Sequence, residues 1–367
     1  MKKICLISDS ASHYRELIYK LMDEQLDCTF IFGSGLKSIK TFNTSVLRNA
    51  KEVVAKNQLG GRCYKIPNLI SLTRGYDVIV DDTGILCTSS WLLAFISHFR
   101  RQKVYLWGHG WYGREGFVKK YLKRVYSALT NGMFVYGQYA NNLMIENGFN
   151  PQKLHVIHNS LDYDLQLKLR KEISENSLYK EHFGNNNPVL IMIGRLNFRK
   201  HLDLLVDAVA ILKKKEKIFN VVLIGSGEDE SKIKHLVTEK GLEDQVWFYG
   251  ACYDEKKNAE LIYNADMCVV PGDIGLTAIH SMMFGCPCLT HDYYPNQGPE
   301  FESIIQGETG CFYHFKDVKS LCETINAWFD DKKDCRDAVR LACYKEVDEN
   351  WNPHKQINII KSVILVD

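Results

Sequence analysis

The sequence has no apolar run long enough to cross a lipid bilayer. Its longest runs, such as WLLAFI and CVVP, are far shorter than the roughly 20 residues that a spanning helix needs. The first residues, MKKICLISDS, have the basic character of a signal peptide, but Asp9 interrupts the apolar run that would have to follow. We therefore predict a chain that does not cross a membrane.

Paired cysteines and a strong net charge are also missing. The twelve cysteines contain no CxxC pair, and most fall in apolar segments, so we interpret them as buried, reduced thiols of a cytoplasmic protein. The closest pair, Cys286 and Cys288, would point to opposite faces of a strand, and we predict no metal site. A formal net charge of +2 gives no field that favours a nucleic-acid partner.

Short apolar runs alternate with segments of helical period along the whole chain. This alternation is typical of parallel sheets covered by helices, and here it occurs twice. A length of 367 residues also favours two domains. We predict an α/β protein with two Rossmann-like domains, residues 1–165 and 166–345, followed by a C-terminal helix in residues 346–367 that packs back on the first domain.

The stretch GRLNFRKHLDLLVDAVAIL places several cations between a strand and a helix. Gly194 ends the strand, and Arg195, Arg199, Lys200 and His201 precede the helix. Cations are disfavoured at the positive end of a helix dipole, and a bound anion would resolve that conflict. The carboxyl ends of parallel strands are also where α/β sheets bind ligands. We predict an anion site here, against the alternative of a basic surface loop.

The next turn, IGSGEDESKIKHL, carries Gly225 and Gly227 directly after a strand. A dinucleotide fingerprint would need a third glycine at Glu230, so nicotinamide binding is not supported. A GxG pair alone is weak evidence for a ligand, and a tight turn is the favoured explanation of these two glycines.

A third turn, GDIGLTAIHSMMFG, leads from a strand into a short helix that Gly285 ends. The amides of Gly275, Leu276 and Thr277 would point out of the start of this helix, ready for a phosphate. The side chain of His280 on this helix would face either a cleft or the core.

These motifs, with VWFYGAC and GETGCFY, resemble in order and separation the second domain of glycosyltransferase family 4, over roughly residues 155–325. The resemblance implies the GT-B architecture, in which two Rossmann-like domains face each other, the second holding the nucleotide and the first the acceptor. It also implies transfer of a sugar from a nucleotide-sugar substrate with retention of configuration, without a metal or other cofactor.

The family's GRLxxxKG motif supplies an arginine and a lysine that neutralise the donor diphosphate, and they match Arg195 and Lys200, while His201 replaces the usual glycine. The E-x7-E carboxylates, which hold the donor sugar and the ribose, align with Gly272 and His280, so both are missing. A histidine can still hydrogen-bond a ribose hydroxyl. Charge neutralisation of the leaving diphosphate matters more for transfer than these two acids.

Four acids near the same sheet edge could replace the missing carboxylates: Asp273, Asp292, Glu300 and Glu302. We prefer Glu300, with a solvated loop acid as the alternative. The predicted donor-binding residues are therefore Gly194, Arg195, Lys200, Gly225, Gly227, Gly275, Leu276, Thr277, His280 and Glu300.

The first domain contributes LWGHGWYGREG, a strand that opens into a glycine-rich loop. By resemblance, His109 contacts the donor sugar or the acceptor, and we group it with Arg195 and Lys200 as a catalytic candidate; a histidine held by packing is the alternative. Trp111 and Tyr112 suit stacking on a sugar face. His13, after the first strand, takes the place of the family's glycine-rich donor loop.

The following helix, FVKKYLKRVYSALT, has four basic residues and an apolar side. It is typical of a helix on an anionic membrane surface, where a lipid-linked acceptor would lie, although a solvated helix explains it almost as well. We therefore predict a glycosyltransferase of surface polysaccharide synthesis (capsule, O-antigen or exopolysaccharide), cytoplasmic or at the inner face of the membrane. The alternatives are a non-catalytic sugar-nucleotide-binding relative and a sugar-nucleotide epimerase.

Overall fold

The computed structural model describes residues 2–35, 40–332 and 334–366. The chain divides into two compact units, Met1–Asp162 with Asn352–Asp367 and Tyr163–Trp351. The expected boundary after residue 165 falls inside the helix α6 (Tyr163–Glu172), and the chain returns to the first unit at Asn352.

The first unit is built on a parallel sheet of seven strands. Its two central strands are buried along almost their whole length and begin with apolar residues, as expected for a sheet that helices cover on both faces. In spatial order the strands are β3 (Ala50–Val54), β2 (Cys28–Ser34), β1 (Ile4–Ser8), β6 (Val78–Asp82), β7 (Lys103–Gly108), β8 (Gly132–Val135) and β9 (Leu154–Val156). A short antiparallel pair, β4 (Lys56–Gln58) and β5 (Cys63–Lys65), lies apart from it.

The second unit is built on a parallel sheet of six strands. In spatial order they are β12 (Val246–Gly250), β11 (Asn220–Ile224), β10 (Val189–Ile193), β13 (Met267–Val269), β14 (Cys288–His291) and β15 (Gly310–Tyr313). Two parallel sheets in two units confirm the predicted fold class.

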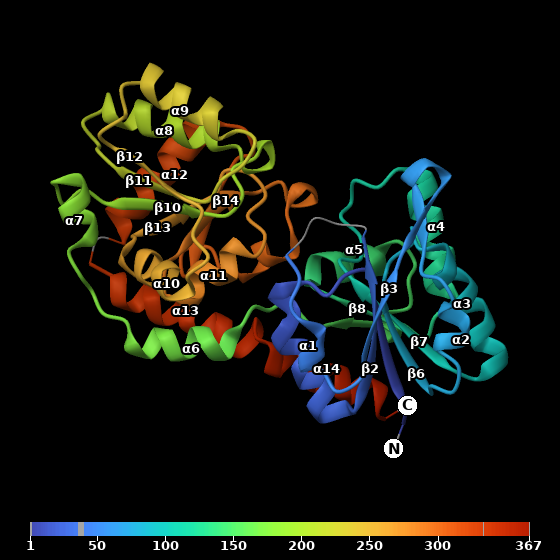
Figure 1. Cartoon of the computed structure of the whole chain (residues 1–367). Helices are drawn as coiled ribbons and strands as arrows, with labels where there is room; N and C mark the ends of the chain where they lie inside the picture. The colour runs from blue at the N-terminus through green and yellow to red at the C-terminus, as the bar shows by residue number, and fades with distance from the viewer. Residues whose placement is uncertain (1, 36–39, 333, 367) are drawn as a thin grey trace. The chain divides into compact units, whose positions relative to one another are not determined.

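Helices flank each sheet (Figure 1). Those of the first unit are α1 (Glu16–Leu26), α2 (Leu69–Leu72), α3 (Thr88–Arg100), α4 (Phe117–Ala128), α5 (Gln138–Glu146) and α14 (Pro353–Ile364). Those of the second are α6, α7 (Leu178–Phe183), α8 (Leu202–Lys213), α9 (Glu230–Glu239), α10 (Glu255–Asn264), α11 (Thr277–Met283), α12 (Val318–Asp331) and α13 (Arg336–Asn350). Short 3-10 turns are η1 (His13–Arg15), η2 (Thr44–Val46), η3 (Leu59–Gly61), η4 (Pro151–Lys153), η5 (Phe198–Lys200), η6 (Tyr294–Asn296) and η7 (Pro299–Ser303).

Each sheet has one point at which the strand order reverses. In the first unit the reversal lies between β1 and β6, and in the second between β10 and β13. Loops that leave neighbouring strands at such a point diverge, and open α/β sheets bind ligands in the crevice that results. The fold therefore marks one candidate site in each unit, at the carboxyl ends of these four strands.

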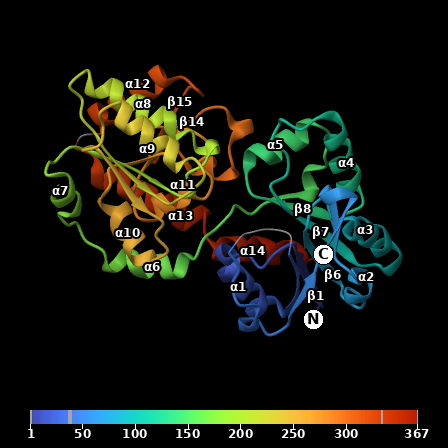
Figure 2. The ribbon, with the colours of Figure 1, turned by 45° about the horizontal axis from the view of Figure 1, so that its top comes forward.

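The helix α14 completes the core of the first unit. Ile357, Ile360 and Ile364 are buried in the same cluster as residues of α1 and of the central strands. Figures 1 and 2 both show α14, in red, beside α1, in blue. Two amide hydrogen bonds fix its start, because Gln356 donates to the carbonyl oxygen of His158 at 2.8 Å and accepts from the Ser160 hydroxyl at 2.9 Å.

In the described part of the chain, no helix combines the length and the hydropathy of a bilayer-spanning segment.

We expect Ile360→Ala to lower the free energy of unfolding of the first unit by about 3 kcal/mol, because it removes buried methyl groups and leaves a cavity between α14 and α1. Urea denaturation followed by circular dichroism measures this change. Ser362→Ala, on the exposed side of the same helix, is the control. Equal midpoints for the two variants would contradict the packing of α14 in this core.

Candidate active site

Two loops at the carboxyl ends of β10 and β11 touch backbone to backbone. A Cβ atom on Gly225 would lie 1.8 Å from the carbonyl oxygen of Gly194, and one on Gly227 would lie 2.1 Å from that of Leu196. The Leu196 amide donates to the carbonyl oxygen of Ser226 at 3.0 Å. Any side chain at Gly225 or Gly227 would push the loops apart. These glycines therefore allow the two loops to pack against each other at the end of the sheet.

Gly272, which we align with the first carboxylate of the E-x7-E pattern, also has no room for a side chain. Its Cβ atom would lie 1.9 Å from the carbonyl oxygen of Arg199, and its amide donates to the carbonyl oxygen of Lys200 at 2.9 Å. The loop after β13 therefore lies directly on the loop after β10. No side chain of any kind can occupy position 272 without moving these loops.

The side chain of Lys200 also joins these two loops through hydrogen bonds. Its Nζ donates to the carbonyl oxygens of Asp273 at 2.6 Å and of Ile274 at 3.1 Å. Burial lowers the pKa of Lys200, and the charges of Asp273 and Glu300 act in the opposite direction. An ammonium group has three donors, so one is left for a ligand oxygen beside the carboxyl end of β10.

The two arginines of this loop differ in their partners. Arg199 forms an ion pair with Asp273. Arg195 is exposed, and its guanidinium makes no hydrogen bond or ion pair with any residue in the described ranges. An arginine presents five donors in a planar fork, which suits the oxygens of a phosphate. Arg195 is therefore available to an anion, whereas Arg199 is not.

His201 shows why this position usually carries glycine. Its backbone lies in the left-handed region, at φ 49° and ψ 44°, immediately before α8. A residue with a side chain adopts this conformation at a cost of about 1–2 kcal/mol. The loop therefore holds a histidine in a backbone conformation that favours glycine.

The start of α11 lies beside Lys200. The Thr277 hydroxyl donates to the carbonyl oxygen of Ile193 at 2.9 Å, and a Cβ atom on Gly194 would lie 3.6 Å from that hydroxyl oxygen. Within the described residues, the amides of Gly275, Leu276 and Thr277 have no hydrogen-bond acceptor. The structure thus brings Gly194, Lys200 and the three amides to one end of the sheet.

Of the four candidate acids, Glu300 is the one near Lys200 whose carboxylate the loops enclose. It is buried in η7, its charge raises the pKa of Lys200, and a Cβ atom on Gly298 would lie 2.8 Å from its Oε2. Asp273 pairs with Arg199, and Asp292 accepts a hydrogen bond from His314 at 2.7 Å. Burial near the lysine favours Glu300 over a solvated acid.

His280, at the position of the second missing carboxylate, already has an acidic partner. Its Nε2 lies 2.8 Å from Oε1 of Glu255, which also accepts from the Gln166 side chain at 2.7 Å. Burial alone would raise the pKa of Glu255, but the charge of His280 and these hydrogen bonds hold it below its ordinary value. A carboxylate from α10 therefore stands next to the histidine that α11 supplies.

His291, at the end of β14, is a buried neutral side chain of the same unit. Its Nδ1 accepts a hydrogen bond from the Tyr293 amide at 3.1 Å, and burial lowers its pKa to about 4. Because this pKa lies below that of an unfolded histidine, the unfolded chain binds more protons between about pH 6.5 and 4. Stability is therefore lost as the pH falls through this window.

The site at the reversal point of the first unit is a cavity of about 990 Å³. Its polar end includes Asp82, at the end of β6, which forms an ion pair with Arg15 and accepts from the Ser8 hydroxyl at 3.0 Å. Burial raises the pKa of Asp82 to about 6, against the effect of Arg15 and with a further contribution from Asp9. A carboxyl group of this kind can accept or release a proton near neutral pH.

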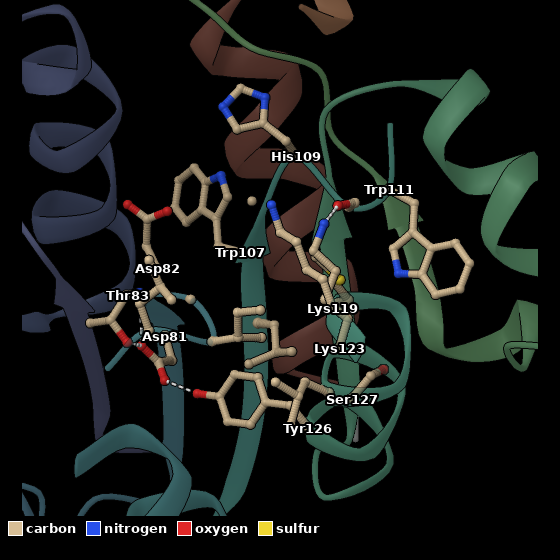
Figure 3. Close-up of a pocket in the computed structure, with 18 of the residues that line it drawn as sticks. Asp81, Asp82, Thr83, Trp107, His109, Trp111, Lys119, Lys123, Tyr126 and Ser127 are labelled. Carbon is tan, nitrogen blue, oxygen red and sulfur yellow. Dashed lines mark hydrogen bonds between the residues drawn. The ribbon is translucent and has the colours of Figure 1, made fainter. Parts of the chain in front are cut away.

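His109 follows β7 and lines this cavity together with Asp82 (Figure 3). Its ring packs 5.7 Å from that of Tyr112 and 5.1 Å from that of Tyr136, measured between centroids. Tyr112 also lines the cavity, and its amide donates to Glu115 at 3.0 Å. The structure therefore brings His109 and Tyr112 together at one site.

Two further residues predicted for the acceptor side are placed differently from His109 and Tyr112. Trp111 lines the cavity, but it is buried among core residues and packs edge to face on Phe149 at 5.2 Å. His13 is exposed in η1, and it is not among the residues that line the cavity. Its neighbours Ser12 and Tyr14 line the cavity instead.

Comparison with known proteins now identifies the second unit. Residues 174–342 match the family model of glycosyl transferases group 1, and this range contains the loops of Arg195, Gly225 and Gly275. The second unit is therefore similar to the group 1 glycosyltransferases over this range. The match confirms the predicted family and, at the level of the family, the predicted transferase class.

The curated relatives of this chain are distant. An uncharacterized 41.2 kDa protein from the cps region of Klebsiella pneumoniae is 25% identical over 227 residues, which cover 59% of this chain and 58% of that protein. The mannosylfructose-phosphate synthase of Agrobacterium fabrum is 30% identical over 159 residues, 40% of this chain and 34% of that one. The chain thus matches less than two thirds of the length of either relative.

Solved structures resemble the whole chain. The Anabaena protein HepE in complex with UDP has a TM-score of 0.76 at 17% identity, and the galactosyltransferase WaaB of the lipopolysaccharide outer core has 0.73 at 14%; both pairs align over 100% of each chain. At these identities the likeness concerns the fold alone, and it confirms the predicted GT-B architecture.

Sequence reasoning missed Glu255, Asp82 and Trp107. Glu255 comes 25 residues before His280, and only the packing of α10 on its neighbours joins the two. Asp82 had a visible signal, because the strand VIVDD ends in two acids at a reversal point of the sheet. Trp107 looked like an ordinary apolar strand residue.

We expect Gly272→Ala to lower the free energy of unfolding of the glycosyltransferase domain by about 3 kcal/mol, because the new methyl group overlaps the Arg199 carbonyl. Gly272→Glu should lower the free energy of unfolding at least as much, and it should not place a carboxylate in the site. Urea denaturation measures both variants. Gly116→Ala, whose Cβ atom meets nothing within 4 Å, is the control. A wild-type midpoint for Gly272→Ala would rule out the close contact of the two loops.

We expect His291→Gln to reduce the loss of stability that acidification causes. With a pKa of about 4 in the folded chain, His291 accounts for about 2 kcal/mol of the loss between pH 7 and pH 5. Urea denaturation at the two pH values gives this difference directly. The exposed His235→Gln should lose as much stability as the wild type, and an equal loss in His291→Gln would contradict its burial in the neutral form.

Proposed function

We propose that the protein transfers a sugar from a nucleotide-sugar donor to a glycan or lipid-linked acceptor in surface polysaccharide synthesis, with retention at the anomeric carbon. The proposal rests mainly on two cations of one loop, Arg195 and Lys200, that both have donors available for an anion. Arg195 has no partner among the described residues, and Lys200 has one donor to spare, at the reversal point of a group 1 glycosyltransferase domain.

The chemistry follows from where charge develops. As the bond between the anomeric carbon and the diphosphate breaks, negative charge grows on the leaving oxygen while the sugar becomes oxocarbenium-like. Arg195, Lys200 and the amides of Gly275 to Thr277 supply donors for that charge, and the hydrogen bonds of Lys200 and the backbone hold all of them but Arg195 in place before the donor binds. The acceptor oxygen then bonds to the anomeric carbon on the face that the diphosphate leaves, and its proton passes to the released diphosphate. Side-chain cations perform the neutralisation, so the proposal includes no metal ion.

The second unit holds further groups for the donor. Glu300 is the carboxylate that we assign to the sugar hydroxyls, since it is buried near Lys200. His280, oriented by Glu255, is assigned to the ribose. Gly225 and Gly227 act indirectly by letting the loops meet. The bound UDP of HepE makes uridine diphosphate the first nucleotide to test.

The first unit is assigned to the acceptor, with His109 and Asp82 at the polar end of its cavity. On its outer side α4 exposes Phe117, Val118 and Tyr121 beside Lys119 and Lys120. Apolar and basic side chains together favour an anionic membrane surface. We therefore assign the protein to the cytoplasmic face of a membrane. The cps-region relative from Klebsiella supports a role in polysaccharide synthesis.

A sugar-nucleotide-binding protein without turnover is the second candidate. It is favoured by the closed position 272 and by a histidine at position 280, which leave the domain without either carboxylate of the family pattern. It would bind the same donor and release no sugar.

We expect Arg195→Ala to weaken nucleotide diphosphate binding at least tenfold, because it removes a charge-assisted contact to phosphate. Calorimetric titration with UDP, GDP, CMP and TDP, and then with the matching nucleotide sugars, measures binding. Release of free nucleotide from the sugar donor measures turnover. Lys319→Ala, an exposed residue on α12, is the control and should bind as the wild type does.

Binding with no release of nucleotide, in the presence or absence of acceptor, would favour the second candidate. Absence of binding to every nucleotide would overturn both.

A further inference from the structure

The cavity of the first unit has an apolar interior that donor binding does not use. Beyond its polar end it is lined by Leu106, Leu122, Tyr126, Met133, Met144 and Phe149. These residues come from α4, α5, the strands β7 and β8, and the loop after α5, and all belong to one unit. At about 990 Å³ the space is large enough for a molecule the size of a long hydrocarbon chain.

The mouth of this cavity is also apolar. Four of its lining residues, Leu86, Phe117, Val118 and Leu122, are exposed, and Phe117 retains 85% of its surface. Within α4 only Tyr126 is buried, so the helix does not use its apolar residues to pack on the sheet. Exposed apolar residues that continue into an apolar cavity indicate an apolar occupant.

Two donors in the same cavity have no acceptor among the described residues. Trp107 is 3% exposed, and its indole Nε1 lacks a hydrogen-bond partner. The Lys119 ammonium makes no hydrogen bond or ion pair, whereas Lys123, one turn later, donates to Gly110 at 2.6 Å and to Glu115 at 2.8 Å. Figure 3 shows the Lys119 and Lys123 side chains extending from α4 toward the side of the cavity where His109 lies.

A buried N–H without an acceptor is unfavourable, and an ammonium group that lines the same cavity favours an anion. A phosphate satisfies both groups, because it carries several acceptor oxygens and a negative charge. A neutral hydrocarbon would fill the apolar part and leave both donors unsatisfied. A free phosphate would satisfy the donors and leave the apolar walls in water.

We propose that this cavity binds a long-chain hydrocarbon phosphate, with the chain between α4 and β7 and the phosphate at Lys119 and Trp107. The inference rests on the proposed function and specifies its acceptor: the sugar that receives the transferred residue is carried on a hydrocarbon phosphate. Its hydroxyl groups then lie toward Asp82 and His109, at the polar end of the cavity.

The test is calorimetric titration of the full chain with dodecyl phosphate below its micelle concentration. Inorganic phosphate and dodecyl maltoside are the comparison ligands, the first without a chain and the second without a charge. We expect dodecyl phosphate to bind at least tenfold more tightly than either. Equal binding of dodecyl maltoside, or binding of inorganic phosphate alone, would overturn the inference.

Three variants locate the phosphate. Lys119→Gln and Trp107→Phe each remove one donor and should weaken dodecyl phosphate binding about tenfold, with little effect on dodecyl maltoside. Lys120→Gln changes the neighbouring lysine, which does not line the cavity, and should bind as the wild type does. Wild-type affinity in both Lys119→Gln and Trp107→Phe would overturn the assignment.

Titration of the same samples with UDP separates this inference from the proposed function and checks that each variant is folded. A wild-type chain that binds UDP but not dodecyl phosphate overturns the inference alone. A chain that binds dodecyl phosphate but no nucleotide overturns the proposed function and, with it, the assignment of the lipid as a sugar acceptor.

Discussion

The candidate donor site depends on three places where one backbone lies directly on another. Gly225 meets Gly194, Gly227 meets Leu196, and Gly272 meets Arg199, each without room for a Cβ atom. Because of these contacts, the loops after β10, β11 and β13 form one layer at the end of the sheet. Cations, amides and a buried acid are then held on that layer by the backbone, so the site does not require a ligand to assemble it.

The same layer explains the missing carboxylates. A glutamate at position 272 would need the loop after β13 to stand away from Arg199, and here Lys200 draws that loop inward through two carbonyl oxygens. The close approach of the two loops therefore leaves no room for a glutamate at position 272. At position 280, a histidine paired with Glu255 keeps a carboxylate nearby, although it now comes from another helix.

Much of the fold could be predicted from the sequence, because buried parallel strands such as VLIMI and NVVLI are apolar at every position and the helices between them have a clear period. The cations and glycines of the second domain were also predictable, since they follow strands directly. The pairing of His280 with Glu255, and the burial of Trp111, depend on packing between segments that the sequence does not connect. The cavity under α4 was hidden for a similar reason: an amphipathic pattern does not reveal that the apolar side stays exposed.

The return of α14 to the first unit has a consequence for synthesis. Ile357, Ile360 and Ile364 belong to the core built on β1, yet the ribosome makes all of Tyr163–Trp351 before it reaches them. The core of the first unit therefore stays incomplete, with some apolar residues exposed, while the second unit is synthesised and can already fold. The domain that begins first is completed last, and during that interval it is the part of the nascent chain most in need of chaperone protection.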